Sequence, residues 1–179
     1  MPAHPRPPYL TDHPYSSLTV AQLRALKTGD TFLETGTNVG HGVQAALDAG
    51  FARVVSIEAD PRLYVLARKR FQHDPRVLIQ LGESWTMLRD RLTGRTRPAT
   101  IYLDAHGGGH TPILDELAVL TEVSRAPHRI LIDDVRMFGT QEWGGIGKPE
   151  ILAALGTLNP RFTLTYVDTT NAAGDLLVA

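Results

Sequence analysis

The sequence predicts an α/β protein built on a doubly wound, mostly parallel sheet of seven strands, with one antiparallel strand near the C-terminus. From residue 31 onward, short strands that are apolar along their whole length alternate with amphipathic helices. Such strands are buried on both faces, which is typical of a parallel sheet covered by helices. Near the C-terminus, two strands are separated only by Asp168–Gly174, a loop short enough for a hairpin. A hairpin requires one of its strands to run antiparallel.

Each element is expected from its local pattern. Pro2, Pro5, Pro7, Pro8 and Pro14 prevent regular pairing, so residues 1–17 are expected to be an extended or poorly ordered arm. Apolar residues three to four positions apart predict helices, and continuous apolar runs predict strands. The expected strands span residues 31–35, 52–57, 76–81, 99–103, 128–132, 162–167 and 175–178; the expected helices span residues 19–26, 40–49, 61–72, 84–92, 112–125 and 148–158.

Composition limits the classes of protein to consider. The 179 residues suffice for one domain with a sizeable core, after an N-terminal region, residues 1–29, that holds the arm and the short helix. A net charge of −1 argues against a nucleic-acid partner. The absence of cysteine excludes disulfides, thiolate metal sites and a cysteine nucleophile. No stretch has the apolar character of a signal peptide or a membrane helix, so we expect a cytoplasmic protein without a membrane partner.

A glycine-rich turn follows the first predicted strand. The strand runs into Glu34, and Gly36, Gly40 and Gly42 come before the next helix. Glycines between a strand and a helix let the backbone approach a ligand and leave amides free at the helix N-terminus. The spacing Glu-x-Gly-x-x-x-Gly differs from the Gly-x-Gly-x-x-Gly of dinucleotide sites. The turn therefore indicates a nucleoside ligand without a pyrophosphate.

The ends of the second and third strands carry further polar candidates. Glu58 lies at the distance from Gly36 expected for a carboxylate that binds a ribose diol, although an acid here could instead complement a helix dipole. Asp60 is already placed to cap that helix, which favours the ribose role. In the segment 82–84, the hydroxyl of Ser84 could contact an adenine edge, cap the following helix, or do both.

Three acids follow the fourth and fifth strands. Asp104, Asp133 and Asp134 should meet at one edge of the sheet, where they would repel one another in a dry pocket. A hard divalent cation such as Mg²⁺ relieves that repulsion, whereas the alternative is that one or two of them cap turns. His106 could be a fourth ligand, a general base or an aromatic wall for adenine.

Taken together, these segments resemble the successive motifs of class I S-adenosylmethionine-dependent methyltransferases, and most of all the metal-dependent O-methyltransferases of the catechol and macrocin types. The resemblance covers residues 30–179 and implies a Rossmann-like methyltransferase domain. The segments that carry it are Glu34-Thr-Gly-Thr-Asn-Val-Gly, Ser56-Ile-Glu-Ala-Asp-Pro, Leu81-Gly-Glu-Ser, Tyr102-Leu-Asp-Ala-His and Ile132-Asp-Asp-Val.

The resemblance implies a role for each motif. The glycine turn would hold the methionine part of S-adenosylmethionine, the acid after the second strand its ribose, and the Gly-x-Ser segment its adenine. The implied donor-binding residues are Glu34, Gly36, Thr37, Gly40, Glu58, Ala59, Gly82, Glu83, Ser84 and Asp104; the implied Mg²⁺ ligands are Asp104, Asp133 and Asp134; and the catalytic candidates are His106 and Asp104. The catechol type has a lysine base three residues after its first metal acid, and this chain has Gly107 there.

We therefore expect Mg²⁺-dependent O-methylation of a small-molecule hydroxyl, diol or catechol-like. Two alternatives stay open: a metal-independent methyltransferase, and a non-catalytic module of the same fold that partners a larger enzyme. The glycine spacing counts against a nicotinamide oxidoreductase. Residues 137–149 could form a flap with Trp143 over the acceptor, or a surface loop with the Trp packed on the body. A homodimer in which the N-terminal arm covers a neighbouring subunit is a further hypothesis.

Overall fold

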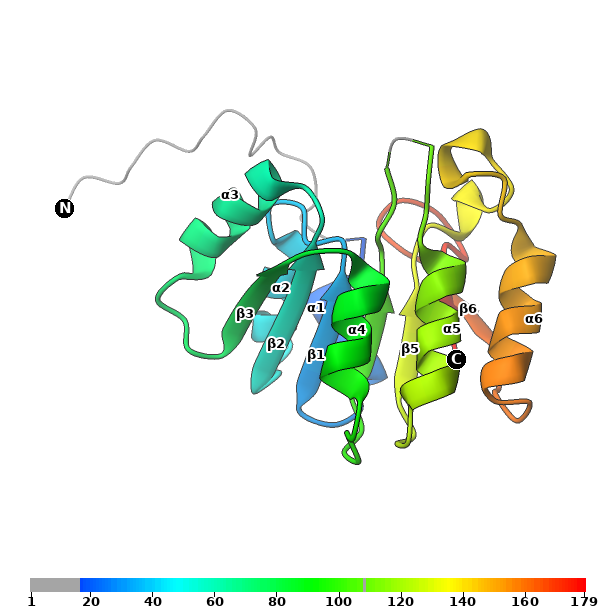
Figure 1. Cartoon of the computed structure of the whole chain (residues 1–179), viewed down its shortest axis with the longest axis horizontal. Helices are drawn as coiled ribbons and strands as arrows, with labels where there is room; N and C mark the ends of the chain where they lie inside the picture. The colour runs from blue at the N-terminus through cyan, green and yellow to red at the C-terminus, as the bar shows by residue number, and fades with distance from the viewer. Residues whose placement is uncertain (1–16, 108) are drawn as a thin grey trace.

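The computed structural model describes residues 17–107 and 109–179, which form one seven-stranded sheet between two helical layers (Figure 1). The strand order is β3-β2-β1-β4-β5-β7-β6. Because the order reverses at β1, the sheet is doubly wound, as the sequence predicts. The expected N-terminal arm lies outside the described residues apart from Ser17. The division into residues 1–29 and 30–179 stays a prediction.

The elements follow the predicted order, with small differences at their ends. The strands are β1 (Thr31–Thr35), β2 (Arg53–Glu58), β3 (Val77–Leu81), β4 (Thr100–Leu103), β5 (Arg129–Ile132), β6 (Thr165–Val167) and β7 (Leu176–Val178). The α-helices are α1 (Val20–Leu26), α2 (His41–Asp48), α3 (Pro61–Phe71), α4 (Ser84–Leu92), α5 (Ile113–Val123) and α6 (Lys148–Leu158), and two short 3₁₀ turns, η1 (Val135–Met137) and η2 (Gln141–Trp143), follow β5.

Several element ends differ from the sequence expectation, two of them for evident local reasons. The strand predicted from residue 99 begins at Thr100, because the Ala99 amide donates to Nδ1 of His128. The strand predicted from residue 162 begins at Thr165, because the Phe162 amide closes a turn onto the carbonyl of Asn159. The helix predicted over residues 112–125 is shorter and spans Ile113–Val123.

Each face of the sheet has its own apolar core, and the two cores assign the helices to their layers. Helices α1, α2 and α3 cover one face, where Phe32, Val54 and Leu131 are buried. Helices α4, α5 and α6 cover the other, where Leu33, Ile101 and Ile130 are buried (Figure 1). None of the helices in the described part of the chain has the length and apolar character needed to cross a membrane.

Four parallel strands end within one residue of a common level. Thr35 of β1 pairs with Ile57 of β2 and with Leu103 of β4, and Leu103 pairs with Ile132 of β5, while β2 continues to Glu58. The residues that follow these positions therefore lie side by side at the carboxyl edge of the sheet. Strand β7 runs antiparallel to both β5 and β6, which confirms the prediction of one antiparallel strand near the C-terminus.

The central strand should carry much of the stability, and an edge strand much less. Leu33 in β1 is 2% exposed, so Leu33→Ala should cost about 2–5 kcal/mol of unfolding free energy through lost burial and the cavity it leaves. Leu81 at the β3 edge is 44% exposed, and Leu81→Ala should cost less than about 1 kcal/mol. Urea unfolding of both variants measures the difference, and equal losses would contradict the described sheet order.

Candidate active site

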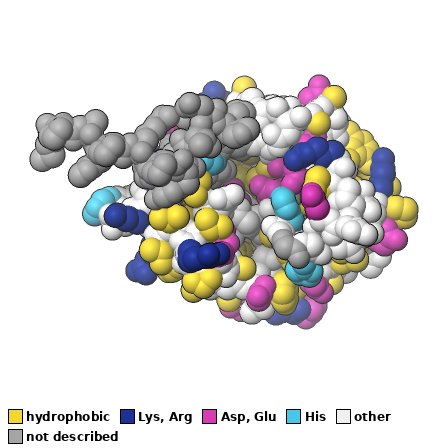
Figure 2. Space-filling model, turned by 90° about the horizontal axis from the view of Figure 1, so that it is seen from above, with side chains coloured by type: hydrophobic (Ala, Val, Ile, Leu, Met, Phe, Trp, Pro, Cys, Tyr) yellow, Lys and Arg dark blue, Asp and Glu magenta, His cyan; other side chains and the backbone are white. Residues whose placement is uncertain are grey.

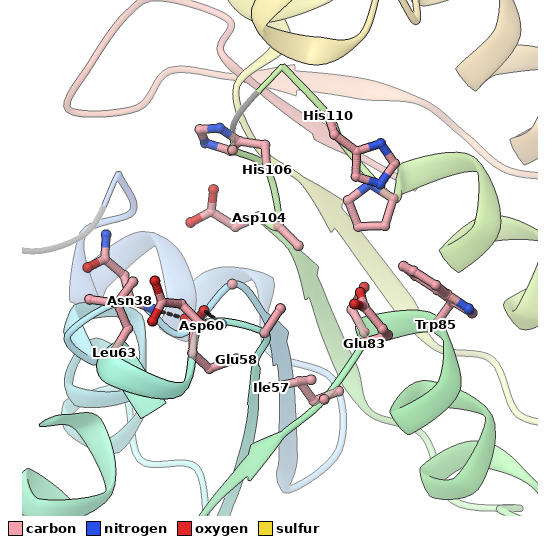
Figure 3. A pocket seen from close by; sticks show the side chains of 17 residues that line it. Asn38, Ile57, Glu58, Asp60, Leu63, Glu83, Trp85, Asp104, His106 and His110 are labelled. Atoms are coloured by element: carbon pink, nitrogen blue, oxygen red, sulfur yellow. Dashed lines mark hydrogen bonds between the residues drawn. The ribbon is translucent and has the colours of Figure 1, made fainter. Parts of the chain in front are cut away.

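A cavity of about 500 Å³ opens at the carboxyl edge of the sheet, beside the turns that follow β1, β2, β3 and β4 (Figure 3). Asp104 and His106 stand on one side of it, and Asn38 and Glu58 lie across from them. Its size suits a nucleoside-containing ligand. The predicted site residues that line it are Gly36, Glu58, Ala59, Gly82, Glu83, Ser84, Asp104 and His106.

Glu58 is held by two backbone amides. The Asn38 amide donates to its Oε2 at 2.7 Å, and the Asp60 amide donates to its Oε1 at 2.8 Å. Asn38 provides its amide from a left-handed conformation, with φ of 51°. An ionised carboxylate has about four lone-pair sites, so each oxygen can still accept a hydrogen bond from a ligand. Asp60 caps α3 by accepting from the Arg62 amide at 2.7 Å, so Glu58 is not needed for that role.

Two glycines of the turn are required by sterics. Gly36 has φ of +82°, and a Cβ there would lie 2.4 Å from the carbonyl oxygen of Asp104. Gly40 has φ of +84°, and a Cβ there would lie 2.4 Å from the ring of Phe71. Gly36 thus lets the β1 turn lie directly against the β4 turn, which brings the donor-site and acid segments together. Gly40 packs against α3 and is not among the residues that line the cavity.

Glu34 forms a buried polar cluster beneath the turn. Its Oε2 accepts from the Ser56 hydroxyl at 2.5 Å, and that hydroxyl lies 2.6 Å from the hydroxyl of Thr37. A Cβ on residue 42 would lie 1.8 Å from Oε1 of Glu34, so Gly42 makes room for the carboxyl group. Burial, opposed by the Ser56 hydrogen bond, raises the pKa of Glu34 to about 8. Glu34 and Thr37 line a second, adjoining cavity of about 290 Å³.

The turn after β3 carries two residues that the sequence predicts to contact an adenine, Glu83 and Ser84. A buried acid of α5, which the sequence did not reveal, is described with them. Glu83 occupies the N-cap position of α4 without a side-chain cap bond, and Ser84 is the first helical residue. The Ser84 hydroxyl is buried and has no hydrogen-bond partner among the described residues. Glu116 of α5 is 1% exposed, and burial raises its pKa to about 7.

The second cavity collects the acids, and Figure 2 shows acidic and histidine side chains gathered beside the hollow at this edge. Asp104, His106 and Asp134 each offer a ligand atom, and these atoms all lie within 4.8 Å of one another. Asp104 lines both cavities, so the acid cluster directly adjoins the candidate donor site. Burial, together with the charges of Asp133 and Asp134, raises the pKa of Asp104 well above its usual range.

Asp133 lies in a different set of contacts from the other two acids. Its Oδ2 accepts hydrogen bonds from the hydroxyls of Ser17 and Tyr102. Its Oδ1 is buried without a hydrogen-bond partner in the described chain. Asp133, Asp134 and Asp175 form a second group whose candidate ligand atoms lie within 4.8 Å of one another. The predicted triad is thus split into two groups that share Asp134.

Asp134 is paired with His106 and with Arg136. Its Oδ2 lies 2.7 Å from Nε2 of His106, and its Oδ1 lies 2.7 Å from the guanidinium of Arg136. Burial raises the pKa of Asp134, but these two partners outweigh it and hold the pKa below its usual value. The hydrogen bond to Asp134 in turn raises the pKa of His106. Arg136 also pairs with Asp175. Arg136 therefore relieves part of the repulsion among the acids. The sequence analysis expects a metal ion to relieve that repulsion.

Trp143 is packed on the body of the protein. Its side chain is 2% exposed, and its ring lies 4.9 Å from that of Phe138 and 6.3 Å from that of His106, measured between centroids. In the described structure this agrees with the packed alternative for residues 137–149. The ring supports His106 from the side of the apolar core.

Several residues that contact the site were not predicted from the sequence. Arg136 lies two positions after the acid pair, where its charge could have been noticed. Tyr102 lies in an apolar strand, and Ser17 comes just before the first helix, so neither has a motif that marks it. The residues missed are Ser17, Tyr102, Glu116, Arg136 and Asp175.

Solved structures with this fold include several methyltransferases. An O-methyltransferase from Bacillus cereus, in complex with S-adenosylhomocysteine, matches with a TM-score of 0.68 and 18% identity, over 99% of this chain and 82% of that chain. A methyltransferase from Podospora anserina, bound to the same molecule, matches with a TM-score of 0.61 and 17% identity, over 89% of this chain and 74% of that chain. The fold is that of S-adenosylmethionine-dependent methyltransferases. No protein-family model and no curated protein sequence matches the chain.

Glu116 should make stability depend on pH. Its pKa is about 7 in the folded protein against a usual 4.5, so the folded state keeps a proton that the unfolded state loses. Its contribution to stability therefore falls as pH rises from about 4.5 to 7. Glu116→Gln removes this loss and should raise the unfolding free energy at pH 8 by up to about 3 kcal/mol, with little change at pH 4. Thermal unfolding at both pH values checks this, and destabilisation by the variant at pH 8 would contradict it.

Proposed function

We propose that this protein is an S-adenosylmethionine-dependent O-methyltransferase that acts on a hydroxyl group of a small molecule. The observation that carries the proposal is Glu58, fixed by two backbone amides at the floor of a nucleoside-sized cavity. The fold shared with structures that bind S-adenosylhomocysteine supports the same donor. The adjoining acid cluster supplies a place for the acceptor hydroxyl.

The donor would lie along the cavity from the glycine turn to the start of α4. Its sulfonium carries the methyl group that is transferred. Gly36 keeps the backbone open beside the methionine part, with Glu34, Thr37 and Gly40 shaping that turn. Glu58 would accept hydrogen bonds from the ribose hydroxyls, next to Ala59. The adenine would contact the segment that holds Gly82, Glu83 and Ser84. The Ser84 hydroxyl there is buried and has no hydrogen-bond partner among the described residues.

Mg²⁺ fits the acid cluster, and we propose Asp104, Asp133 and Asp134 as its ligands. Asp133 offers a buried oxygen that lacks a partner among the described residues, and Asp104 and Asp134 approach each other at the cavity wall. Carboxylate oxygens are the ligands that Mg²⁺ prefers. Bound there, the ion would supply a Lewis acid that favours ionisation of an acceptor hydroxyl. Asp104 lies between the two cavities and would therefore face both donor and acceptor.

His106 is the proposed general base. Asp134 holds Nε2 of its imidazole at 2.7 Å, which leaves Nδ1 as the nitrogen able to accept a proton from the acceptor. The ring is 34% exposed and lines both cavities, so an acceptor can reach it. His106 would thereby replace the lysine base of the catechol type, because Gly107 occupies the position of that lysine and has no side chain.

A second candidate is a methyltransferase that works without a metal. The observation that favours it is Arg136, whose guanidinium pairs with both Asp134 and Asp175. Arg136 would then provide the positive charge at the acceptor site, and a neutral His106, oriented by Asp134, would remove the proton.

The donor assignment is tested by titrating S-adenosylmethionine into the protein in a calorimeter. Glu58→Gln removes a charged acceptor from the proposed ribose contact, and the loss of one or two hydrogen bonds to a charged group should weaken binding about 10- to 100-fold. Glu122→Gln removes an acid of the same type at an exposed ion pair on α5 and should bind as the wild type does. Unchanged binding by Glu58→Gln would overturn the donor site.

Chelation separates the two candidate mechanisms. With a vicinal-diol acceptor, EDTA and Asp133→Asn should each reduce methyl transfer at least about 100-fold if the ion orients and ionises the acceptor. Added Mg²⁺ should restore the chelated wild type but not the variant. Transfer that survives EDTA, yet is lost in Arg136→Gln, would establish the metal-independent mechanism instead.

A further inference from the structure

We infer that Ser17 is a positioning residue of the proposed metal site and that it acts together with Tyr102 on Asp133. The inference rests on the proposed function, because it concerns how the chain prepares one of the proposed ligands. It assigns a role at the site to a residue that lies outside the predicted methyltransferase domain, before the first helix.

The hydrogen bonds to the Asp133 carboxylate all go to one of its two oxygens in the described chain. The hydroxyls of Ser17 and Tyr102 both donate to Oδ2, and the two hydroxyl oxygens lie 2.5 Å apart. Asp133 is 2% exposed, and its Oδ1 is buried without a partner in the described chain. A buried carboxylate oxygen without a donor is costly, so its persistence points to a ligand. The two hydroxyls fix the orientation of the carboxyl group and leave Oδ1 for that ligand.

The donors at Asp133 also differ in charge from those at its neighbours. Asp134 is paired with Arg136 and His106, and Asp175 is paired with Arg136. Within the described residues, the hydrogen bonds to the Asp133 carboxylate come from the neutral hydroxyls of Ser17 and Tyr102. Its charge is therefore the least compensated of the three, which suits an oxygen that binds a cation.

Ser17 is itself held firmly in place. Its carbonyl oxygen accepts from the Thr170 amide at 2.8 Å, in the loop between β6 and β7. The next residue, Leu18, is 2% exposed in the core under α1. Gln22 of α1 closes a capping box with Thr19 and donates to the Asp168 carbonyl at 2.5 Å. The start of α1 and the β6–β7 loop thus clamp the Ser17 hydroxyl against Asp133.

The test uses the full chain and Mn²⁺, an oxygen-seeking ion whose free form is counted directly by electron paramagnetic resonance. Ser17→Ala and Tyr102→Phe each remove one hydroxyl from Oδ2 and should weaken Mn²⁺ binding on the order of 10- to 100-fold, as loss of a group that orients a metal ligand does. Ser17→Thr keeps a hydroxyl and should bind within a few-fold of wild type. Thr19→Ala removes a nearby hydroxyl but keeps the backbone contacts that hold Ser17 and the start of α1, and it should bind as wild type does.

Thermal unfolding of each variant accompanies the titrations, and S-adenosylmethionine binding should be unchanged in all four variants. Weak Mn²⁺ binding in Ser17→Ala and Tyr102→Phe, with near-normal binding in Ser17→Thr and Thr19→Ala, supports the inference. Normal binding in Ser17→Ala, or equal weakening in Thr19→Ala, overturns it and leaves the proposed metal site intact. If wild type binds S-adenosylmethionine but no Mn²⁺, the metal part of the proposed function fails and this inference fails with it. Should Ser17→Ala not fold, the pair Tyr102→Phe and Ser17→Thr decides the question.

Discussion

Strands β1, β4 and β5 stop at one level and β2 ends one residue beyond it, and the chemistry at the carboxyl edge follows from that registration. Pairing of Thr35 with Ile57 and Leu103, and of Leu103 with Ile132, means that the next residues along the four strands lie side by side. Those residues are the start of the glycine turn, the acid that two amides hold, and the acids of the second cavity. Gly36 then removes the last steric obstacle between the first turn and the Asp104 backbone. The cavity beside Glu58 and the acid cluster therefore share a wall at Asp104.

Bringing acids together at a buried edge costs free energy, and the chain offsets that cost in four different ways. Backbone amides donate hydrogen bonds to Glu58, which keeps a buried acid ready for a ligand. Arg136 and His106 pair with Asp134, and neutral hydroxyls donate to one oxygen of Asp133. For Glu34, burial raises the pKa to about 8 and favours the protonated form at neutral pH. The difference in partners predicts which of these oxygens are available to a cation.

The sequence predicted the sheet, its single antiparallel strand and most of the polar residues that line the cavity beside Glu58, because strand periodicity and glycine spacing are local signals. Gly36 follows β1 and Glu58 ends β2, and both strands are recognisable from their apolar pattern. Contacts between side chains that are far apart in the sequence leave no such local signal. Ser17 meets Asp133 only because the start of α1 is clamped to the β6–β7 loop. Arg136 meets Asp175 only because β7 inserts beside β5. For this reason the sequence did not reveal that Asp134 belongs to two groups of candidate ligands, one with Asp104 and His106 and one with Asp133 and Asp175.

A crystal structure of the protein grown with S-adenosylhomocysteine and Mn²⁺ tests the shared edge most directly. The expected result has the ribose hydroxyls on Glu58, the adenine against the start of α4, and the ion bonded to Asp104, Asp133 and Asp134 in the adjoining cavity. A nucleoside bound elsewhere, or a cavity that holds no nucleoside in the presence of saturating ligand, would contradict the account.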